Sequence, residues 1–294
     1  MTFDSQPRNA RVGTTMALGS MSCVQLGLAV SVGLSAQLGA EGVAWLRLTW
    51  AAVILLVIAR PWRASWNHTT LLTCILLGIA TAGMTLMFMA AAVRIPLGTA
   101  SALEFLGPLG VAVAHGRGFD RLWAVAAAAG VLALTEPWHG TTDPAGILLA
   151  LGSAACWAAY IMLTQRAGDQ VAGLQSLAIS MPVAALVASI VVGPAVAGHL
   201  NWQLIVVGLG LALLLPAIPF SLELLALRRL TASAFGTLMS LEPAIAVVVG
   251  FVILGQVPRT SAVVGILLVV TAGIGAARGG QRLTPPSPVA PHLT

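Results

Sequence analysis

Apolar residues run through most of the chain in stretches long enough to cross a bilayer, and short polar segments separate them. A helix needs about 20 mostly apolar residues to span the hydrocarbon core. The polar segments are often only a few residues of Pro, Gly or Asn, which leaves no room for a soluble domain. The pattern predicts ten spans, at residues 12–36, 42–59, 71–93, 96–115, 121–136, 145–166, 171–193, 202–226, 231–254 and 260–277.

These spans predict an all-α integral membrane protein with two units of five helices, at residues 12–137 and 145–278. Residues 1–11 and residues 279–294, the latter with four prolines, are expected to form disordered N- and C-terminal tails. The first apolar stretch follows basic residues, as in a signal peptide. Because it is longer than a signal-peptide core and similar stretches follow it, we expect an uncleaved first span.

The composition supports the same class of protein. The chain has 294 residues, of which 58% are hydrophobic and 8% charged, and its mean hydropathy is +0.96. A soluble domain carries roughly 25% charged residues, so a soluble enzyme and a disordered chain are both excluded. Three cysteines lie in apolar runs, and no disulfide framework is expected. The net charge of +5 comes from dispersed arginines rather than a basic patch, so no nucleic-acid partner is predicted.

The placement of the arginines predicts the orientation. All 14 basic residues are arginine, and ten spans place both termini on one side of the membrane. If that side is the cytoplasm, eleven arginines lie in cytoplasmic segments, Arg94 and Arg259 lie outside, and Arg47 lies within a span. The positive-inside rule therefore predicts cytoplasmic termini.

Two pairs of segments are similar and occur in the same order. Residues 19–23 match residues 152–156, and residues 94–113 overlay residues 229–248. The repeat unit then holds five spans. Because five is odd, the second copy enters the membrane from the opposite side and is inverted relative to the first. The sequence predicts two halves related by a pseudo-twofold axis in the membrane plane, a transporter design with the substrate site near the midplane between the halves.

Ionisable residues inside spans indicate where such a site lies. A charge at the bilayer centre costs about 2.5–3.5 kcal/mol for Arg or Asp on insertion scales. Arg47 and Glu223 lie near span ends, so each could extend to the interface or act in the interior. Glu104 and Glu242 lie deep in repeat-related spans, three alignment positions apart and on nearly one helical face. They are the candidates for binding a substrate or carrying protons. The alternative is a buried, protonated Glu bonded to neighbouring backbone.

Prolines within the same spans predict helix breaks. Proline removes the backbone N–H that would bond the carbonyl four residues earlier. Carbonyls freed in this way are tolerated at membrane depth only where protein or a watery cavity surrounds them. The alternative is that the prolines form simple kinks that aid helix packing. The predicted breaks lie at Pro108, Pro216, Pro219 and Pro243.

Further side chains could line a cavity between the helices. Aromatic residues at helical spacing are more often packing residues, and a glutamine within a span can equally bond a neighbouring helix. The candidate lining residues, besides those above, are Gln25, Phe105, Trp157, Tyr160, Glu223 and Met239.

Catalytic and metal-binding motifs are missing from the sequence. It contains no H-E-x-x-H, no G-x-S-x-G, no Asp within a predicted span and no Lys, so a Walker A motif is excluded. We therefore expect no enzyme, no cofactor and no metal site. If the protein moves a solute, the energy must come from an ion gradient or from the gradient of the solute itself.

Several short motifs in both halves carry a family resemblance. They are Leu-Arg-Leu at 46–48, Arg-Pro-Trp-Arg at 60–63, Ile-Pro-Leu-Gly at 95–98, Ala-Leu-Glu-Phe at 102–105, Ala-Cys-Trp-Ala at 155–158, Gln-Arg-Ala-Gly at 165–168, Ser-Leu-Glu at 221–223 and Phe-Gly-Thr-Leu-Met-Ser-Leu-Glu-Pro-Ala at 235–244. With them, residues 12–278 resemble the drug/metabolite transporter superfamily with two EamA-type repeats, and within it the bacterial threonine and homoserine exporters. One departure is Gln256, where such repeats usually end in Gly-Glu.

The resemblance implies an inverted-repeat carrier of ten helices in the bacterial cytoplasmic membrane, with the fifth helix of each half peripheral. It implies proton-driven export of small neutral amino acids by alternating access, with Arg47 near the substrate carboxylate or paired with a Glu. One alternative is export of a different metabolite or drug by the same fold. Others are a membrane-embedded enzyme acting on lipid and a non-transporting scaffold.

Overall fold

The described part of the chain is helical throughout. The computed structural model describes residues 5–63, 66–115, 121–135, 143–170, 175–196, 202–213, 215, 218–219, 222, 226 and 238–279. Its helices are α1 (Ser5–Leu38), α2 (Ala40–Ala59), α3 (His68–Ala92), α4 (Leu97–Glu104), α5 (Leu106–His115), α6 (Arg121–Thr135), α7 (Pro144–Gln170), α8 (Gln175–Val196), α9 (Trp202–Ala212), α12 (Glu242–Leu254) and α13 (Thr260–Gly279), with a short 3₁₀ turn at Pro61–Arg63.

Many of these helices suit a membrane. Five helices, α1, α2, α3, α7 and α8, are long and apolar enough to cross a bilayer. Shorter apolar helices lie within the ranges of the other predicted spans: residues 97–111, 122–134, 202–212, 242–254 and 260–275. The prediction of an all-helical, multi-pass membrane protein is confirmed by this pattern together with the family described below.

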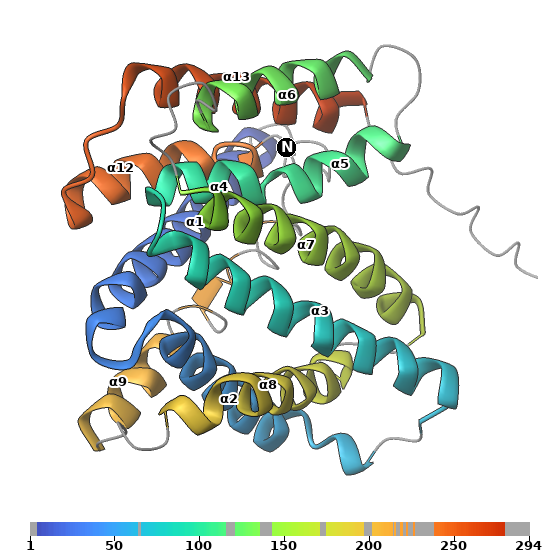
Figure 1. Ribbon diagram of the computed structural model, residues 1–294. Coiled ribbons are helices and arrows are strands. Elements are labelled where there is room, and N and C mark those ends of the chain that lie inside the picture. Colours follow the sequence, from blue (N-terminus) through green and yellow to red (C-terminus); the bar gives the residue numbers. More distant parts are fainter. Residues whose placement is uncertain are drawn as a thin grey trace, which may run out of the picture.

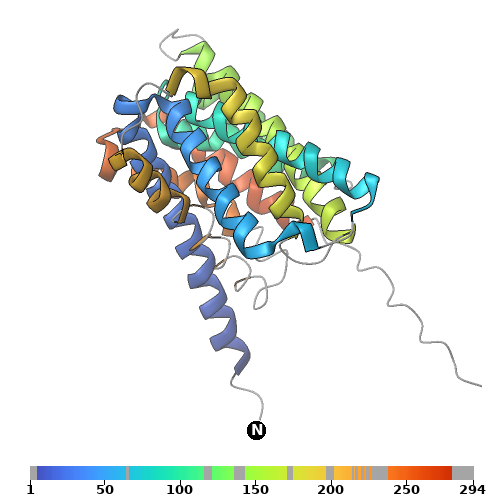
Figure 2. The same ribbon diagram turned by 90° about the horizontal axis from the view of Figure 1, so that it is seen from below.

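The expected N-terminal tail differs from the structure. Residues 1–11 were expected to be disordered, but α1 begins at Ser5, while the apolar part of this helix, Arg11–Ala36, agrees with the predicted span at 12–36. Hydropathy marks the part of a helix that lies in lipid, not the end of the helix itself. Pro7 does not prevent the earlier start, because its missing N–H falls in the first turn, where no intrahelical hydrogen bond is due. Figure 2 shows this end of α1 extending beyond the other helices.

Two glycines allow abrupt changes of chain direction. Gly39 has a φ of 73° and separates α1 from α2, while Gly255 has a φ of 65° and ends α12. Glycine adopts these positive values without the clash of a Cβ atom. The backbone N–H of Gln256 then donates to the backbone carbonyl oxygen of Gly250 at 3.1 Å.

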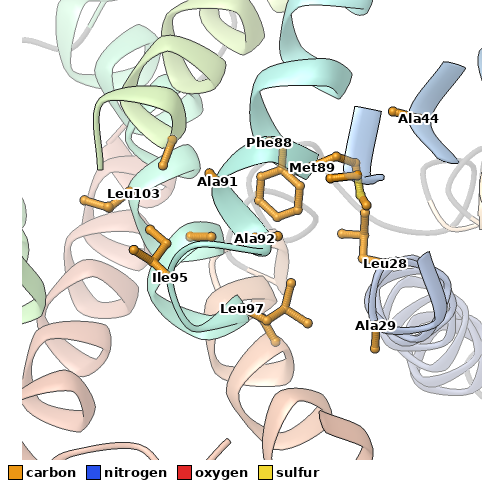
Figure 3. Close-up of a cluster of buried hydrophobic side chains, with 14 of the residues drawn as sticks. Leu28, Ala29, Ala44, Phe88, Met89, Ala91, Ala92, Ile95, Leu97 and Leu103 are labelled. Atoms are coloured by element: carbon orange, nitrogen blue, oxygen red, sulfur yellow. The ribbon is translucent and has the colours of Figure 1, made fainter. Parts of the chain in front are cut away.

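The helices pack in pairs taken from distant parts of the sequence. Helix α3 lies along α7, α2 along α8, and α6 along α13 (Figure 1). Leu28 of α1, Phe88 and Met89 of α3, and Leu97 and Leu103 of α4 join in one apolar cluster (Figure 3). This cluster fixes α4 against the long helices and so positions the end of α4, where Glu104 lies.

The contact between α6 and α13 is reciprocal. A Cβ atom added at Gly130 would lie 2.8 Å from the carbonyl oxygen of Gly265, and one added at Gly265 would lie 2.7 Å from that of Gly130. Glycine at both positions lets the two backbones approach closely, as small residues do at membrane helix interfaces.

Two helix interruptions occur near the deep glutamates. Helix α4 ends at Glu104 and α5 begins at Leu106, with Pro108 in the first turn of α5. A turn at Ser240 and Leu241 precedes α12, which begins at Glu242 and has Pro243 in its first turn. One glutamate therefore ends a helix and the other begins one.

Candidate functional site

Glu104 lies at the contact between α4, α7 and α3. The hydroxyl oxygen of Ser153, on α7, is 2.6 Å from Glu104 Oε1 and 2.9 Å from the backbone oxygen of Met84 on α3. Ser153 is fully buried. Gly107 brings α5 against the same part of α7, because a Cβ atom there would meet the carbonyl of Ala154. The carboxyl group is thus held between helices from the two halves of the sequence.

Glu242 has a different partner, on α1. Gln25 donates from Nε2 to Glu242 Oε1 at 3.2 Å, and both side chains are buried, with 1% of Gln25 and 9% of Glu242 exposed. The other amide atom, Gln25 Oε1, has no hydrogen-bond partner among the described residues. A buried acceptor without a donor is costly, so this atom is suited to a ligand that carries N–H or O–H groups.

Arg47 is partly buried among the helices. Its Nη1 atom is buried and has no hydrogen-bond partner among the described residues. The guanidinium of Arg47 is near enough to attract the carboxylate of Glu104 electrostatically, and Glu104 in turn interacts with Glu242. Within the described part of the chain, no salt bridge joins Arg47 to Glu104. The structure therefore brings the three predicted charged residues together and leaves a donor of Arg47 available.

The predicted aromatic lining residues pack against one another. Phe105 is 5% exposed, and its ring meets Trp157 edge-on with centroids 6.4 Å apart. Tyr160 lies on the same helix as Trp157 and is partly buried. Met239 is partly buried beside Met21 of α1.

The structure describes three of the four prolines predicted to break helices. Pro219 is buried, and its carbonyl accepts a hydrogen bond from Ser20 at 3.1 Å. Pro108 is partly buried and Pro243 fully buried, each in the first turn of its helix. Pro216 and Glu223 lie outside the described residues.

Gln256, the departure noted in the sequence, has a structural contact. Its Oε1 accepts the backbone N–H of Leu97 at 2.9 Å, which satisfies one of the open donors at the N-terminus of α4. A carboxylate oxygen at this position could accept the same bond. Gln256 therefore joins the end of α12 to the helix that carries Glu104.

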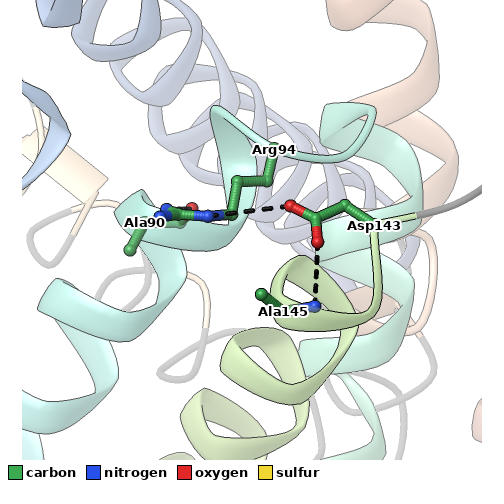
Figure 4. A network of polar contacts seen from close by, with 4 residues as sticks. All are labelled: Ala90, Arg94, Asp143 and Ala145. Carbon is green, nitrogen blue, oxygen red and sulfur yellow. Dashed lines mark hydrogen bonds and ion pairs between the residues drawn. The ribbon is translucent and has the colours of Figure 1, made fainter.

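A polar contact joins the end of α3 to the start of α7. Arg94 Nε lies 3.7 Å from Asp143 Oδ2, Arg94 Nη1 donates to the carbonyl of Ala90, and Asp143 Oδ1 accepts from the amide of Ala145 (Figure 4). A pocket of about 210 Å³ lies beside this pair and is also lined by Gln256 and Arg259.

Sequence reasoning did not single out Ser153, Asp143 or a bond made by Gln256. Asp143 could have been found, because Asp followed by Pro is a usual start for a helix. Ser153 lay within the repeat motif, but a single serine in an apolar helix gives no sign of its partner. Among the described residues, no three His, Cys, Asp or Glu side chains form a group that could hold a metal ion.

Apolar helices of spanning length that enclose two carboxylates and an arginine are typical of membrane transport proteins, since such groups are retained in a bilayer for function. The comparisons with known proteins agree. Residues 144–276 match the EamA-like transporter family. The threonine/homoserine exporter RhtA of Escherichia coli K12 is 37% identical over 263 residues, covering 88% of each chain. That of Salmonella typhimurium LT2 is 36% identical over 261 residues, covering 87% of this chain and 88% of its own.

The chain belongs to the EamA-like transporter family. A solved protein crystal structure also resembles it over 92% of this chain and 98% of its own, with a TM-score of 0.57 and 16% identity. At that identity the resemblance shows the fold alone.

Proposed function

We propose that this protein exports small neutral amino acids, such as threonine and homoserine, from the bacterial cytoplasm in exchange for protons. It does so from a central site formed by Arg47, Glu104, Glu242 and Gln25. The similarity to the curated exporters supports the substrate class. The buried polar cluster between the helices supports the position of the site.

The single observation that carries the substrate assignment is a complementary pair of buried atoms. Among the described residues, Gln25 Oε1 is an acceptor without a donor, and Arg47 Nη1 is a donor without an acceptor. An amino-acid zwitterion supplies both missing partners, because its ammonium donates and its carboxylate accepts. Glu242 beside Gln25 and Glu104 near Arg47 would balance the remaining positive charge.

The proposed architecture is ten spans in two inverted repeats, and equivalent contacts support it. Ser20 bonds the carbonyl of Pro219 and Ser153 bonds that of Met84. The two serines match in the repeat motif, and Met84 and Pro219 have the same spacing as Arg94 and Arg229. Each bond joins the first helix of one half to the third span of the other.

Two further pairs of contacts follow the same relation. Gly19 approaches Leu222, and Gly152 approaches Met87. The close contact between Gly130 and Gly265 joins two residues that are separated by the same number of positions as Arg94 and Arg229, so they are equivalent to each other in the proposed repeat. A twofold axis between the halves produces pairs of this kind, and alternating access would then arise from movement of one half against the other.

The two carboxyl groups support proton coupling. Like charges close together in a desolvated site are not readily both ionised, so proton uptake and substrate binding can be linked there. The excess of arginine in the proposed cytoplasmic segments supports cytoplasmic termini, and therefore export through the cytoplasmic membrane. Export of another small metabolite by the same fold is the competing assignment.

Proteoliposomes containing the purified protein test this proposal. They are loaded with labelled threonine or homoserine, and a proton gradient is imposed with the acidic side outside. We expect efflux above that of empty liposomes, abolished by a protonophore. Efflux that ignores the protonophore would contradict proton coupling. Absence of any amino-acid flux, with another labelled metabolite transported by the same preparation, would contradict the substrate class.

A further inference from the structure

The hydroxyl of Ser153 has two acceptors and one hydrogen. It lies 2.6 Å from Glu104 Oε1 and 2.9 Å from the carbonyl oxygen of Met84. A serine hydroxyl can donate only once, although it can also accept. Both short contacts are satisfied together only when Glu104 carries a proton and donates it to Ser153, which in turn donates to Met84.

Loss of the proton reverses this chain of hydrogen bonds. An ionised Glu104 can only accept, so the Ser153 hydrogen turns toward Oε1 and its bond to Met84 is broken. Met84 lies inside α3, and its carbonyl keeps the acceptor role of an α-helix, so no buried group is left unsatisfied. The heavy atoms need not move for the reversal, and only hydrogens change position.

We infer that Ser153 is a positioning residue for proton binding at Glu104, and that its hydroxyl links the protonation state of Glu104 to the contact between α7 and α3. This inference rests on the proposed function. It adds that the two deep carboxyls differ, with Glu104 as the proton site and Glu242, beside Gln25, as the residue nearer the substrate ammonium.

The proton step is balanced by water. On release, the O–H bond of Glu104 breaks and the proton passes to water in the opened cavity, while no covalent bond of Ser153 changes. Among the described residues, the charged groups that act on Glu104 are Arg47 from α2 and Glu242 from α12. Helices α3, α6, α7 and α13 also pack against α4, and their described residues add the Ser153 hydroxyl but no further charge that acts on Glu104.

The position of Ser153 favours this role over a merely structural one. Serine hydroxyls in membrane helices often bond a backbone carbonyl, and Ser31 of α1 bonds the carbonyl of Gly27 in its own helix at 2.7 Å. Ser31 is as fully buried as Ser153, but its recorded bond is to backbone alone. It therefore provides a matched control in which a buried hydroxyl bonded to backbone is removed.

Infrared difference spectroscopy tests the inference without relying on transport. The C=O band of a protonated carboxyl is followed against pH in reconstituted protein, and the Glu104→Gln variant identifies the part due to Glu104. We expect Ser153→Ala to shift the midpoint of this band by about one pH unit, since a hydrogen bond to a carboxyl contributes on that order. Ser153→Thr, which keeps a hydroxyl, should restore the midpoint, and Ser31→Ala should not change it.

A midpoint that is the same in Ser153→Ala and in the unmodified protein would overturn the inference. So would a Glu104 band that does not titrate at all. Either result would leave amino-acid efflux in the unmodified protein untouched, so it is distinguishable from a failure of the proposed function. In the efflux assay, the pH profile should shift in Ser153→Ala and not in Ser31→Ala.

Discussion

The two deep glutamates lie at related places in the proposed halves, yet their surroundings differ. Glu104 ends α4 and contacts the hydroxyl of Ser153, with Arg47 nearby. Glu242 begins α12 and contacts the amide of Gln25. Each glutamate bonds a side chain on the first helix of the opposite half. Both glutamates thus make a bond to the opposite proposed half, but one contacts a hydroxyl and the other an amide.

The difference suggests a division of tasks. A hydroxyl can donate or accept as the proton moves, whereas the Gln25 amide presents a fixed donor to Glu242 and a fixed acceptor to a ligand. In the proposed repeat the two glutamates lie three alignment positions apart, and each contacts a different kind of side chain. The following predictions separate the shared framework from the differing chemistry.

The largest expected effect lies in the shared framework, at the crossing of α6 and α13. Gly130→Val and Gly265→Val should each destabilise the protein by about 1–3 kcal/mol, because the added side chain meets the opposing carbonyl. The reciprocal geometry predicts similar losses for the two variants. Thermal unfolding in detergent measures them, with Gly110→Val as the control, since a Cβ atom added there would meet no described atom within 4 Å beyond its own stretch of helix. Clearly unequal losses would contradict the proposed symmetry at this crossing.

The next largest effect concerns Arg47. Arg47→Gln should weaken substrate binding about 10- to 100-fold, because a hydrogen bond to a charged carboxylate contributes about 1.5–3 kcal/mol. Binding of labelled threonine to purified protein measures this loss. Arg166→Gln, an exposed arginine on α7, is the control. Unchanged affinity in Arg47→Gln would remove Arg47 from the proposed site.

Gln25 should have a smaller effect on the same binding measurement. Gln25→Leu keeps much of the volume but removes the acceptor for the substrate ammonium and the donor to Glu242. We expect affinity to fall about 5- to 10-fold, because a typical hydrogen bond contributes about 1 kcal/mol. Gln203→Leu, on the exposed side of α9, should bind normally. Equal binding by both variants would assign Gln25 to helix packing instead.

The smallest expected effect is on stability and concerns Gln256. Gln256→Ala removes the acceptor for the N–H of Leu97 and should cost about 0.5–2 kcal/mol, while Gln256→Glu keeps an acceptor and should cost less or nothing. Thermal unfolding compares the two, with Gln203→Ala as the control. A loss in Gln256→Glu as large as that in Gln256→Ala would show that the cap contact is not what Gln256 contributes.

Hydropathy alone predicted the helical membrane class and the approximate positions of the long helices, because lipid requires long apolar segments. It could not predict that α1 begins at Ser5, since a helix can continue beyond the lipid without apolar residues. The interruption at Glu104 was predictable to within a turn from Pro108, whose missing N–H weakens the helix just before it.

The partners in the proposed site were less predictable. Charge and depth drew attention to Glu104, Glu242 and Arg47, because ionisable groups in a membrane are rare and costly. That Ser153 would meet Glu104 depends on how α7 packs against α4, and a contact between distant helices leaves no periodic signal in one sequence. The unsatisfied atoms of Gln25 and Arg47 are likewise visible only when every neighbour is in place.

The most direct test compares Glu104→Gln with Glu242→Gln in proteoliposomes, at matched protein levels and with Glu41→Gln as the control. Proton-driven efflux and threonine exchange at equal pH are measured side by side. We expect Glu104→Gln to lower proton-driven efflux far more than exchange, because only the proposed proton site is lost. We expect Glu242→Gln to lower both together, because substrate binding is lost. If both variants transport threonine as well as the unmodified protein, the two glutamates do not form the transport site.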